Sequence, residues 1–387
     1  MRSRLHLIWL LLLVLASPAL TLLGGCGDKI AIPQPEGLFG ISLYREWANF
    51  QADEPVVDLV VSQGRLFTLT ADSLSKRNLT FSQSDSVGGL SGAAALCVEE
   101  DSNLVFVWED DLKQMNWYSG SNLALRGSTS LPDVDMVVAM AANDAGIDQV
   151  PGALTYLYLS DPVAGVIHRY AFDMFAGLTS NGILARSNGD AARFVHIPGG
   201  MATDLENRFL VCDVDTNRNW VIRFDGTPDL TDVALNPSEE DPQRGTAVPF
   251  VVSDCLVAPA SDFVLGFAAT CSQTDWVGRT GSAEDEFHSP NDVAVDGSGR
   301  IFVADTNNDR VQIFQPLGEF DLQLGSTPET PGATAVGVYD HRTGVGADEV
   351  NFGAFVFVLL PGENVIRKFI SSEHADFLNE DLPPPPQ

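Results

Sequence analysis

The chain has 387 residues, of which 45% are hydrophobic, and its 22 basic and 52 acidic residues give a formal net charge of −30. This length and apolar content are sufficient to bury a large core within one domain. The charge argues against nucleic acid as a partner, because a polyanion would be repelled, whereas cations or basic proteins would be attracted. Because the acidic residues are scattered along the chain, solubility is the favoured interpretation of this charge.

The N-terminus has the features of a secretion signal. Arg2 and Arg4 precede an apolar run from Leu7 to Ala16, and the small residues Gly24-Gly25 follow. This order of basic, apolar and small residues is typical of a signal peptide. A membrane-spanning helix is the alternative, but Ser17-Pro18 interrupts the run.

The stretch Leu23-Gly24-Gly25-Cys26 resembles the lipobox of bacterial lipoproteins. The resemblance implies removal of residues 1–25 and a diacylglycerol on the Cys26 thiol, with palmitate among the acyl chains. Each buried acyl methylene contributes about 0.8 kcal/mol, so the acyl chains alone would hold the protein on a bilayer. Loss of Arg2 and Arg4 would lower the formal charge from −30 to −32. We therefore expect a bacterial cell-envelope protein that faces the periplasm or the cell surface.

Composition divides the rest of the chain into three parts. Residues 26–37 form a polar tether that contains proline, and residues 373–387 form a Pro-rich tail that we expect to be disordered. Residues 38–372 are the predicted folded domain.

A unit from Phe287 to Phe320 shows the pattern most clearly. Its apolar segments Val293–Val295, Ile301–Val303 and Val311–Phe314 are bounded by Gly, Asp or Asn, which predicts short antiparallel strands joined by tight turns. With Pro290-Asn291-Asp292 before them, these segments resemble the NHL repeat, whose unit is one blade of a β-propeller. One blade cannot bury its own faces, so the unit must recur.

The spacing of this unit does recur along the chain. Asp305 lies fifteen residues after Pro290 and nine before Phe314. Further copies, the one at Asp213 two residues longer, are marked by Thr70 with Leu79, Trp108 with Trp117, Asp161 with Tyr170, Asp213 with Phe224, and Leu360 with Phe369. A degenerate copy at Phe267 and Trp276 fills the remaining gap. We predict an all-β propeller of NHL type with four-stranded antiparallel blades, and we favour seven blades over six, the usual number in the resembled family.

The two ends of the domain are predicted to meet. The last unit ends near Phe369 with its third strand, whereas Ile41 to Trp47 precedes the first unit and has no partner there. The N-terminal segment would then supply the outer strand of the final blade and cover its open edge.

The central channel of the ring is one candidate site. Asn291-Asp292 is similar to calcium-dependent lactonase propellers, which implies a channel metal held by several blades. His196 and His288 occupy nearly equivalent positions, but zinc requires at least three protein ligands. The alternative is that Asn291 and Asp292 bond local backbone where an inner strand begins. We expect no cofactor, with calcium or zinc as the alternative.

Cysteines and recurring aromatic residues have structural interpretations. Cys255 and Cys271 are candidates for a disulfide, whereas Cys97 and Cys212 lie in apolar strands and are expected to be buried thiols. The recurring aromatic residues could stack on carbohydrate, but packing between blades is favoured because they recur in nearly every unit. They are Trp108, Trp117, Tyr170, Phe224, Trp276, Phe314 and Phe369.

Three long excursions are the other candidate site, because specificity in a propeller lies in its turns and insertions. They span Ala142 to Gly152, Thr227 to Gly245, and His341 to Gly353. Their acids are Asp144, Asp148, Glu239, Glu240, Asp348 and Glu349. We predict a non-enzymatic, lipid-anchored scaffold that binds a protein, peptide or glycan through these rim loops. A channel-centred metal-dependent hydrolase or lyase is the alternative.

Overall fold

The computed structural model describes twelve segments of the chain. They are residues 44–100, 102–143, 155–185, 197–204, 209–215, 219–224, 247–251, 281–284, 286–316, 320–324, 330–343 and 350–371. The chain divides into two units, Met1–Ser42 and Leu43–Gln387, and every described residue belongs to the second.

The described strands form six antiparallel sheets of four strands each, which are the blades of a β-propeller. Blade 1 consists of β2 (Val56–Ser62), β3 (Arg65–Thr70), β4 (Ser73–Asn78) and β5 (Gln83–Gly88). Blade 2 consists of β6 (Ala93–Glu99), β7 (Leu104–Glu109), β8 (Gln114–Ser119) and β9 (Leu125–Ser130). Blades 3 and 4 are β10 (Ala139–Ala142), β11 (Thr155–Asp161), β12 (Val166–Asp173), β13 (Gly177–Ala185), and β14 (Pro198–Thr203), β15 (Phe209–Asp213), β16 (Trp220–Phe224), β17 (Ala247–Val251).

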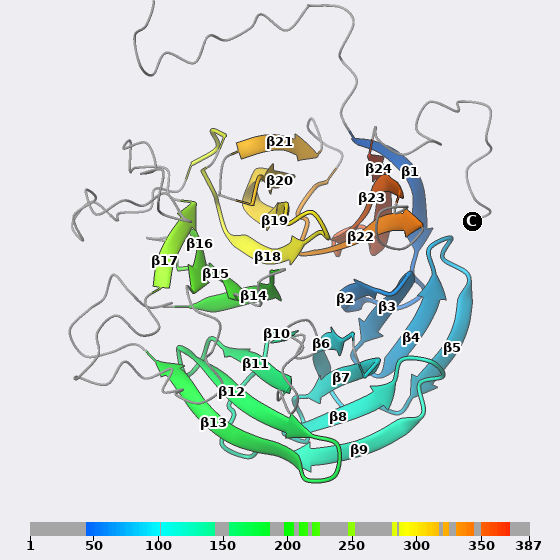
Figure 1. The fold of residues 1–387 in the computed structure, drawn as a ribbon, viewed down its shortest axis with the longest axis vertical. Coiled ribbons are helices and arrows are strands. Elements are labelled where there is room, and N and C mark those ends of the chain that lie inside the picture. The colour runs from blue at the N-terminus through cyan, green and yellow to red at the C-terminus, as the bar shows by residue number, and fades with distance from the viewer. Residues whose placement is uncertain are drawn as a thin grey trace, which may run out of the picture. The chain divides into compact units, whose positions relative to one another are not determined.

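Blades 5 and 6 complete the set. They are β18 (Pro290–Val295), β19 (Ile301–Asp305), β20 (Arg310–Phe314), β21 (Phe320–Leu324), and β22 (Ala335–Thr343), β23 (Val350–Leu360), β24 (Val365–Ser371), β1 (Tyr44–Gln51). A short 3-10 helix, η1 (Thr306–Asn308), joins β19 to β20. The sheets surround a common centre, with the first strand of each blade innermost (Figure 1).

The propeller has six blades, so the prediction of seven is wrong. Inner strands contact one another around the whole ring in the order β2, β6, β10, β14, β18, β22 and back to β2. A Cβ on Gly200 of β14 would lie 2.4 Å from the Asp292 Cα of β18, which leaves no room for a blade between them. Phe267 and Trp276, which marked the seventh unit, lie outside the described residues.

The N-terminal strand closes the ring, as predicted from Ile41 to Trp47. β1 pairs with β24 from Tyr44 opposite Ser371 to Gln51 opposite Val365, and the first three residues of the predicted segment lie outside the described residues. The Asn364 side chain strengthens the junction, since its Nδ2 donates to the Ala52 carbonyl at 2.8 Å. The first and last strands of the domain therefore share one blade.

A carboxylate at the end of the second strand recurs in four of the described blades. It accepts a hydrogen bond from the backbone N–H of the segment that leads into the inner strand of its own blade. The bonds are His288 N to Asp305 (2.7 Å), Ile197 N to Asp213 (3.1 Å), Asp135 N to Asp161 (2.9 Å) and Ser91 N to Glu109 (2.6 Å). In these four blades the hydrogen bond acts as a latch that fixes where the inner strand begins.

Aromatic side chains fill the spaces between blades. Phe172 of blade 3 meets Phe106 and Trp117 of blade 2, with ring centroids 4.9 Å and 5.4 Å away. Tyr158 of blade 3 stacks on Phe209 of blade 4 at 4.5 Å. The recurring aromatics whose side chains are described are all buried, namely Trp108, Trp117, Tyr170, Phe314 and Phe369. Packing between blades is therefore their role.

Removing β1 is expected to destabilise the whole propeller. Deletion of residues 44–51 would expose the edge of β24 and the apolar face that Tyr44 covers against Phe302. We expect the unfolding temperature to fall by roughly 10 °C or more, because several kcal/mol of packing would be lost. Differential scanning calorimetry measures the change. Deletion of residues 379–387 is the control, and equal melting of both variants would contradict the closure.

Candidate functional site

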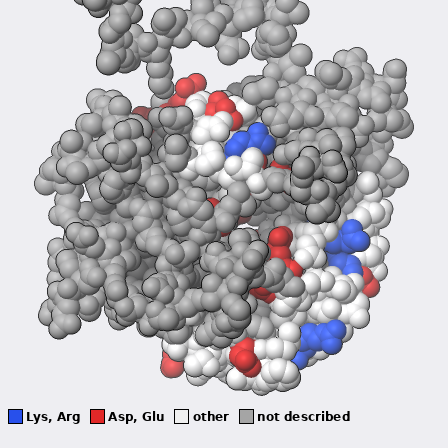
Figure 2. Space-filling model, in the orientation of Figure 1, with Lys and Arg blue, Asp and Glu red and all other residues white. Residues whose placement is uncertain are grey.

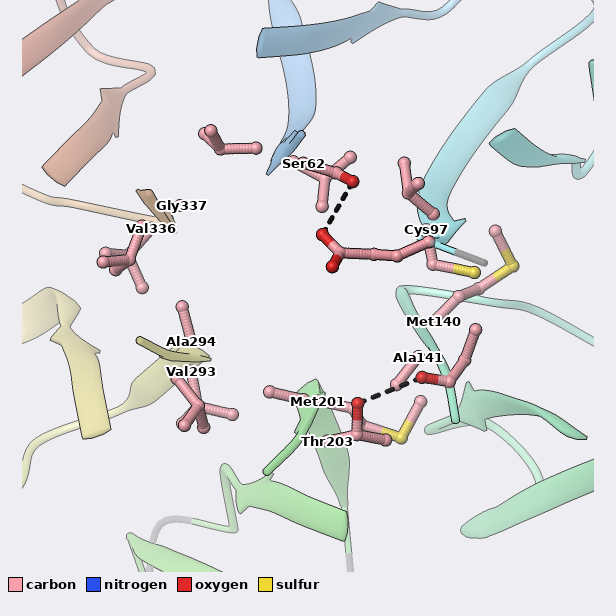
Figure 3. A pocket seen from close by; sticks show the side chains of 18 of the residues that line it. Ser62, Cys97, Met140, Ala141, Met201, Thr203, Val293, Ala294, Val336 and Gly337 are labelled. Carbon is pink, nitrogen blue, oxygen red and sulfur yellow. Dashed lines mark hydrogen bonds between the residues drawn. The ribbon is translucent and has the colours of Figure 1, made fainter. Parts of the chain in front are cut away.

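The inner strands enclose a channel at the centre of the ring. It contains a cavity of about 430 Å³ that residues of all six inner strands line. Figure 3 shows labelled side chains from different blades, among them Cys97, Met201 and Val336, around this common space. The channel therefore brings together residues that are far apart in the sequence.

Strand register divides the inner strands into layers, because each inner-strand residue can be placed by the residue that it faces on the second strand of its own blade. The layer where the inner strands begin consists of Asp58, Ala95, Ala139, Gly200, Asp292 and Ala335. A middle layer is small and apolar, with Val60, Cys97, Ala141, Ala202, Ala294 and Gly337. The first layer thus contains two carboxylates among four small residues.

The opposite end, where the inner strands end, is also acidic. The lining carboxylates at this end are Glu99, Glu100, Asp204, Asp296 and Asp340. With Asp58 and Asp292 the described lining contains seven carboxylates and no Lys, Arg or His. Acidic side chains are visible beside the central opening in Figure 2. The described part of the channel therefore has a strongly negative potential.

Some of these carboxylates are held by nearby groups. Asp296 pairs with Arg300, whose Nε lies 2.7 Å from its Oδ2. The Ser62 hydroxyl donates to Glu100 Oε1 at 2.7 Å and so joins blade 1 to the turn that follows β6 of blade 2. Thr203 Oγ1 similarly donates to the Ala142 carbonyl at 3.0 Å, between blades 4 and 3.

Asp58 joins two blades at the beginning of the channel. Its Oδ1 accepts from Leu59 N and its Oδ2 from Leu96 N on blade 2, both at 2.8 Å. Burial raises the pKa of the Asp58 carboxyl from 3.8 to about 7, although these two backbone hydrogen bonds act in the opposite direction.

Asp292 makes the equivalent bond at another junction. Its Oδ2 accepts from Val336 N on blade 6 at 2.8 Å. Burial, and then the charge of Asp58, raise the pKa of Asp292 well above its usual range. Since Asp58 influences Asp292, the two carboxyls belong to one electrostatic group.

The predicted channel residues are only partly brought together. Asp292 lines the cavity, whereas His288 and Asn291 are absent from its described lining. The backbone N–H of His288 bonds to Asp305 at 2.7 Å. His196 lies outside the described residues. Asp292 does bond backbone, but that of the neighbouring blade as well as its own. Among the described residues, no group of three or more His, Cys, Asp or Glu is arranged to hold a metal ion.

Sequence analysis missed Asp58 because the first turn of blade 1 is short. Gln63 and Gly64 form a tight turn with φ of 48° and 70°, whereas the equivalent turn of blade 5 runs from Asp296 to Arg300. Alignment on equal intervals therefore placed Val57, rather than Asp58, opposite Asp292.

The three predicted excursions are attached at one end of the ring. They connect β10 to β11, β16 to β17 and β22 to β23, and antiparallel connectivity places these turns at the end where the inner strands end. Part of the third excursion is paired strand, since Arg342 lies opposite Asn351 and Thr343 opposite Val350. The six candidate rim acids, Asp144, Asp148, Glu239, Glu240, Asp348 and Glu349, lie outside the described residues.

Two of the cysteines are described. Cys97 and Cys212 are free and buried, as predicted, and burial raises the pKa of both thiols. Both are therefore inert packing residues in this structure. Cys255 and Cys271, the candidate disulfide, lie outside the described residues.

Comparison with known proteins identifies one repeat. Residues 287–314, in blade 5, match the model of the NHL repeat. The B-box type zinc finger protein ncl-1 of Caenorhabditis elegans is 50% identical over 46 residues, and protein brain tumor of Drosophila melanogaster is 48% identical over 48 residues. Each match covers 12% of this chain and only 5% of the relative.

Similar solved structures are enzymes with very different sequences. Virginiamycin B lyase from Staphylococcus aureus is 8% identical with a TM-score of 0.48, over 84% of this chain and 99% of that chain. A luciferin-regenerating enzyme is 10% identical with a TM-score of 0.49, over 85% of this chain and 96% of that chain. Similarity at this level does not transfer their activities to this chain.

Substitution of Gly200 by alanine is expected to disturb the channel. The added methyl group would lie 2.4 Å from the Asp292 Cα and 2.6 Å from the Asn291 carbonyl oxygen, so blades 4 and 5 would have to separate. We expect a loss of about 1–3 kcal/mol of stability in urea unfolding. Gly88→Ala, whose methyl would meet nothing within 4 Å, is the matched control. Equal stability of the two variants would disprove the close approach.

Proposed function

We propose that this chain is a lipid-anchored envelope propeller that binds a basic protein or peptide at the end of the ring where the inner strands end. The observation that carries the proposal is the acidic channel, whose described lining contains no basic residue. All three excursions are attached at the same end, and insertions on one face of a repeat protein commonly form its binding surface. Glycans remain a second class of ligand for this surface.

Charge explains why the partner would be basic. A cleft lined by carboxylates with apolar walls concentrates its electric field and attracts cations from a distance. Burial limits water at several of these groups, since Glu99 and Asp204 are 2% and 8% exposed. A positive side chain would therefore bind at this opening with a more favourable electrostatic free energy than on an open acidic surface. Binding would weaken as the salt concentration increases.

The localisation rests on the N-terminal sequence. Cys26 after Leu23-Gly24-Gly25 is the proposed site of lipid attachment, which would place the propeller outside the cytoplasm. None of the helices described for this chain has the length and apolar character needed to cross a bilayer.

A metal-dependent hydrolase or lyase is the second candidate function. One observation favours it: Asp58 and Asp292 bring carboxylate oxygens from two blades to the same layer of the channel. Native mass spectrometry of the purified protein distinguishes the candidates, because one tightly held calcium or zinc ion would favour the enzyme.

Substitution of Cys26 tests the anchor. Cys26→Ala removes the proposed acylation site, so we expect the variant to move from the detergent phase to the aqueous phase in a detergent partition experiment. Cys97→Ala is the control, because that thiol is buried in the propeller. Continued partition of Cys26→Ala into detergent would mean that residues 5–23 are retained as the anchor.

Neutralising the acidic end tests partner binding. The triple variant Glu100→Gln, Asp204→Asn and Asp340→Asn removes three of the lining charges. We expect capture of a partner from envelope extract to fall at least tenfold, about 1.4 kcal/mol, and the remaining binding to depend less on salt. Asp321→Asn, an exposed position on the outer strand β21, is the control for the loss of one negative charge away from the channel.

Shortening the three excursions to the lengths in blade 5 provides the complementary measurement. If capture survives this change but is lost in Asp58→Asn or Asp292→Asn, binding occurs in the channel and not at the rim. Unchanged capture in every variant would overturn the proposal.

A further inference from the structure

Two carboxylates hold neighbouring blades together at the beginning of the channel. Asp58 of β2 bonds to Leu96 N of β6, and Asp292 of β18 bonds to Val336 N of β22. Each acceptor and each donor occupies the equivalent register position in its blade. The same bond therefore joins blade 1 to blade 2 and blade 5 to blade 6.

The donors lie on an edge that has no strand partner. β6 and β22 are the innermost strands of their sheets, so the backbone of one edge faces the channel. A buried N–H without an acceptor costs about 1–3 kcal/mol, and a carboxylate of the preceding blade supplies that acceptor here. Each carboxylate thus accepts a hydrogen bond from the inner strand of the next blade and fixes the distance between the two inner strands.

We propose that Asp58 and Asp292 are a proton-controlled pair of clamps, and that ionisation of both carboxyls loosens the inner ring at this end of the channel. The residues at the other positions of the layer are Ala or Gly, which leave room for the carboxyls but offer no charge to balance them. With both carboxyls ionised, the layer would hold two negative charges among apolar neighbours.

The surroundings favour one or more protons on the pair. Burial, and then the charges of Asp58 and Glu99, raise the pKa of Cys97 on β6, and burial, and then the charges of Asp292, Asp213 and Asp305, raise that of Cys212 on β15. The titratable neighbours of the pair on these strands are therefore the thiols Cys97 and Cys212. Both are neutral thiols, and none of the described channel residues is basic. Tyr339 and Asp340 of β22 belong to the opposite end of that strand. A second negative charge would therefore be stabilised by movement of the inner strands or by entry of a cation.

The direction of the pH dependence follows from the raised pKa of both carboxyls. Their unfolded value is 3.8, and Asp58 titrates near 7 in the folded ring. The neutral pair therefore stabilises the fold fully below a pH of about 4, and this contribution is lost as pH rises through 7. This property concerns the fold itself and does not depend on the proposed partner or anchor.

The test compares the pH dependence of unfolding in the full-length protein in detergent. In the wild-type protein the raised pKa of Asp58 increases the unfolding equilibrium constant by up to about tenfold per pH unit between pH 4 and 7, and the raised pKa of Asp292 adds to this slope above pH 4. We expect Asp58→Asn and Asp292→Asn each to reduce this slope, and the double variant to reduce it further. Asp321→Asn is the control and should keep the wild-type slope. Equal slopes in all four proteins would overturn the proposal.

Two measurements on the wild-type protein cover the case in which a variant does not fold. Infrared spectroscopy should detect a protonated carboxyl at pH 6 whose signal decreases as pH rises to 8, and its absence at pH 6 would overturn the proposal. Hydrogen exchange should show that peptides with Leu96 and Val336 lose protection between pH 6 and 8, beyond the intrinsic rise in exchange rate. A peptide with Val107, on the second strand of blade 2, is the internal control, and equal loss in all three peptides would contradict local loosening.

Discussion

Each four-stranded sheet of this protein has two apolar faces and cannot bury either of them alone. Burial is achieved only between blades, where rings such as Phe172 and Trp117 pack face to edge at 5.4 Å. The ring must therefore close on itself, because an unclosed ring would leave two sheet faces and one sheet edge in water. The inner strands come so close that Gly200 has no space for a methyl group beside Asp292. The central channel follows from this closure.

Much of the fold could be predicted because the need to bury both faces of each sheet repeats from blade to blade. The interval from Pro290 to Asp305 recurs along the chain, and its recurrence located the strands. The unpaired N-terminal segment correctly indicated how the ring closes. The number of blades could not be read from spacing, because a long insertion costs little free energy and occupies no fixed place in the ring. The gap between Phe224 and Phe287 was therefore taken for a blade that contact between β14 and β18 rules out.

The site was harder to predict than the fold. Asp292 was found through its motif, but Asp58 was displaced by one residue because Gln63-Gly64 makes a shorter turn. The acidic lining comes from five of the six blades, and no local pattern links residues as distant as Glu99 and Asp340. The histidines were selected for equivalent sequence positions, yet His288 contributes its backbone to a latch and not its ring to the described channel. Equivalent position in a repeat therefore predicts structure better than shared function.

The shared blade of β1 and β24 also has a consequence for how the protein is made. Tyr44 pairs with Ser371, so the first strand of the domain cannot find its partner until nearly the whole chain has been delivered. Contacts so distant in sequence form late and slowly, because a very long loop must close first. A chain that crosses a membrane in the unfolded state would benefit from this delay. The ring therefore closes only after β24 is present. A prematurely ended chain would be left with an open ring that proteases can recognise.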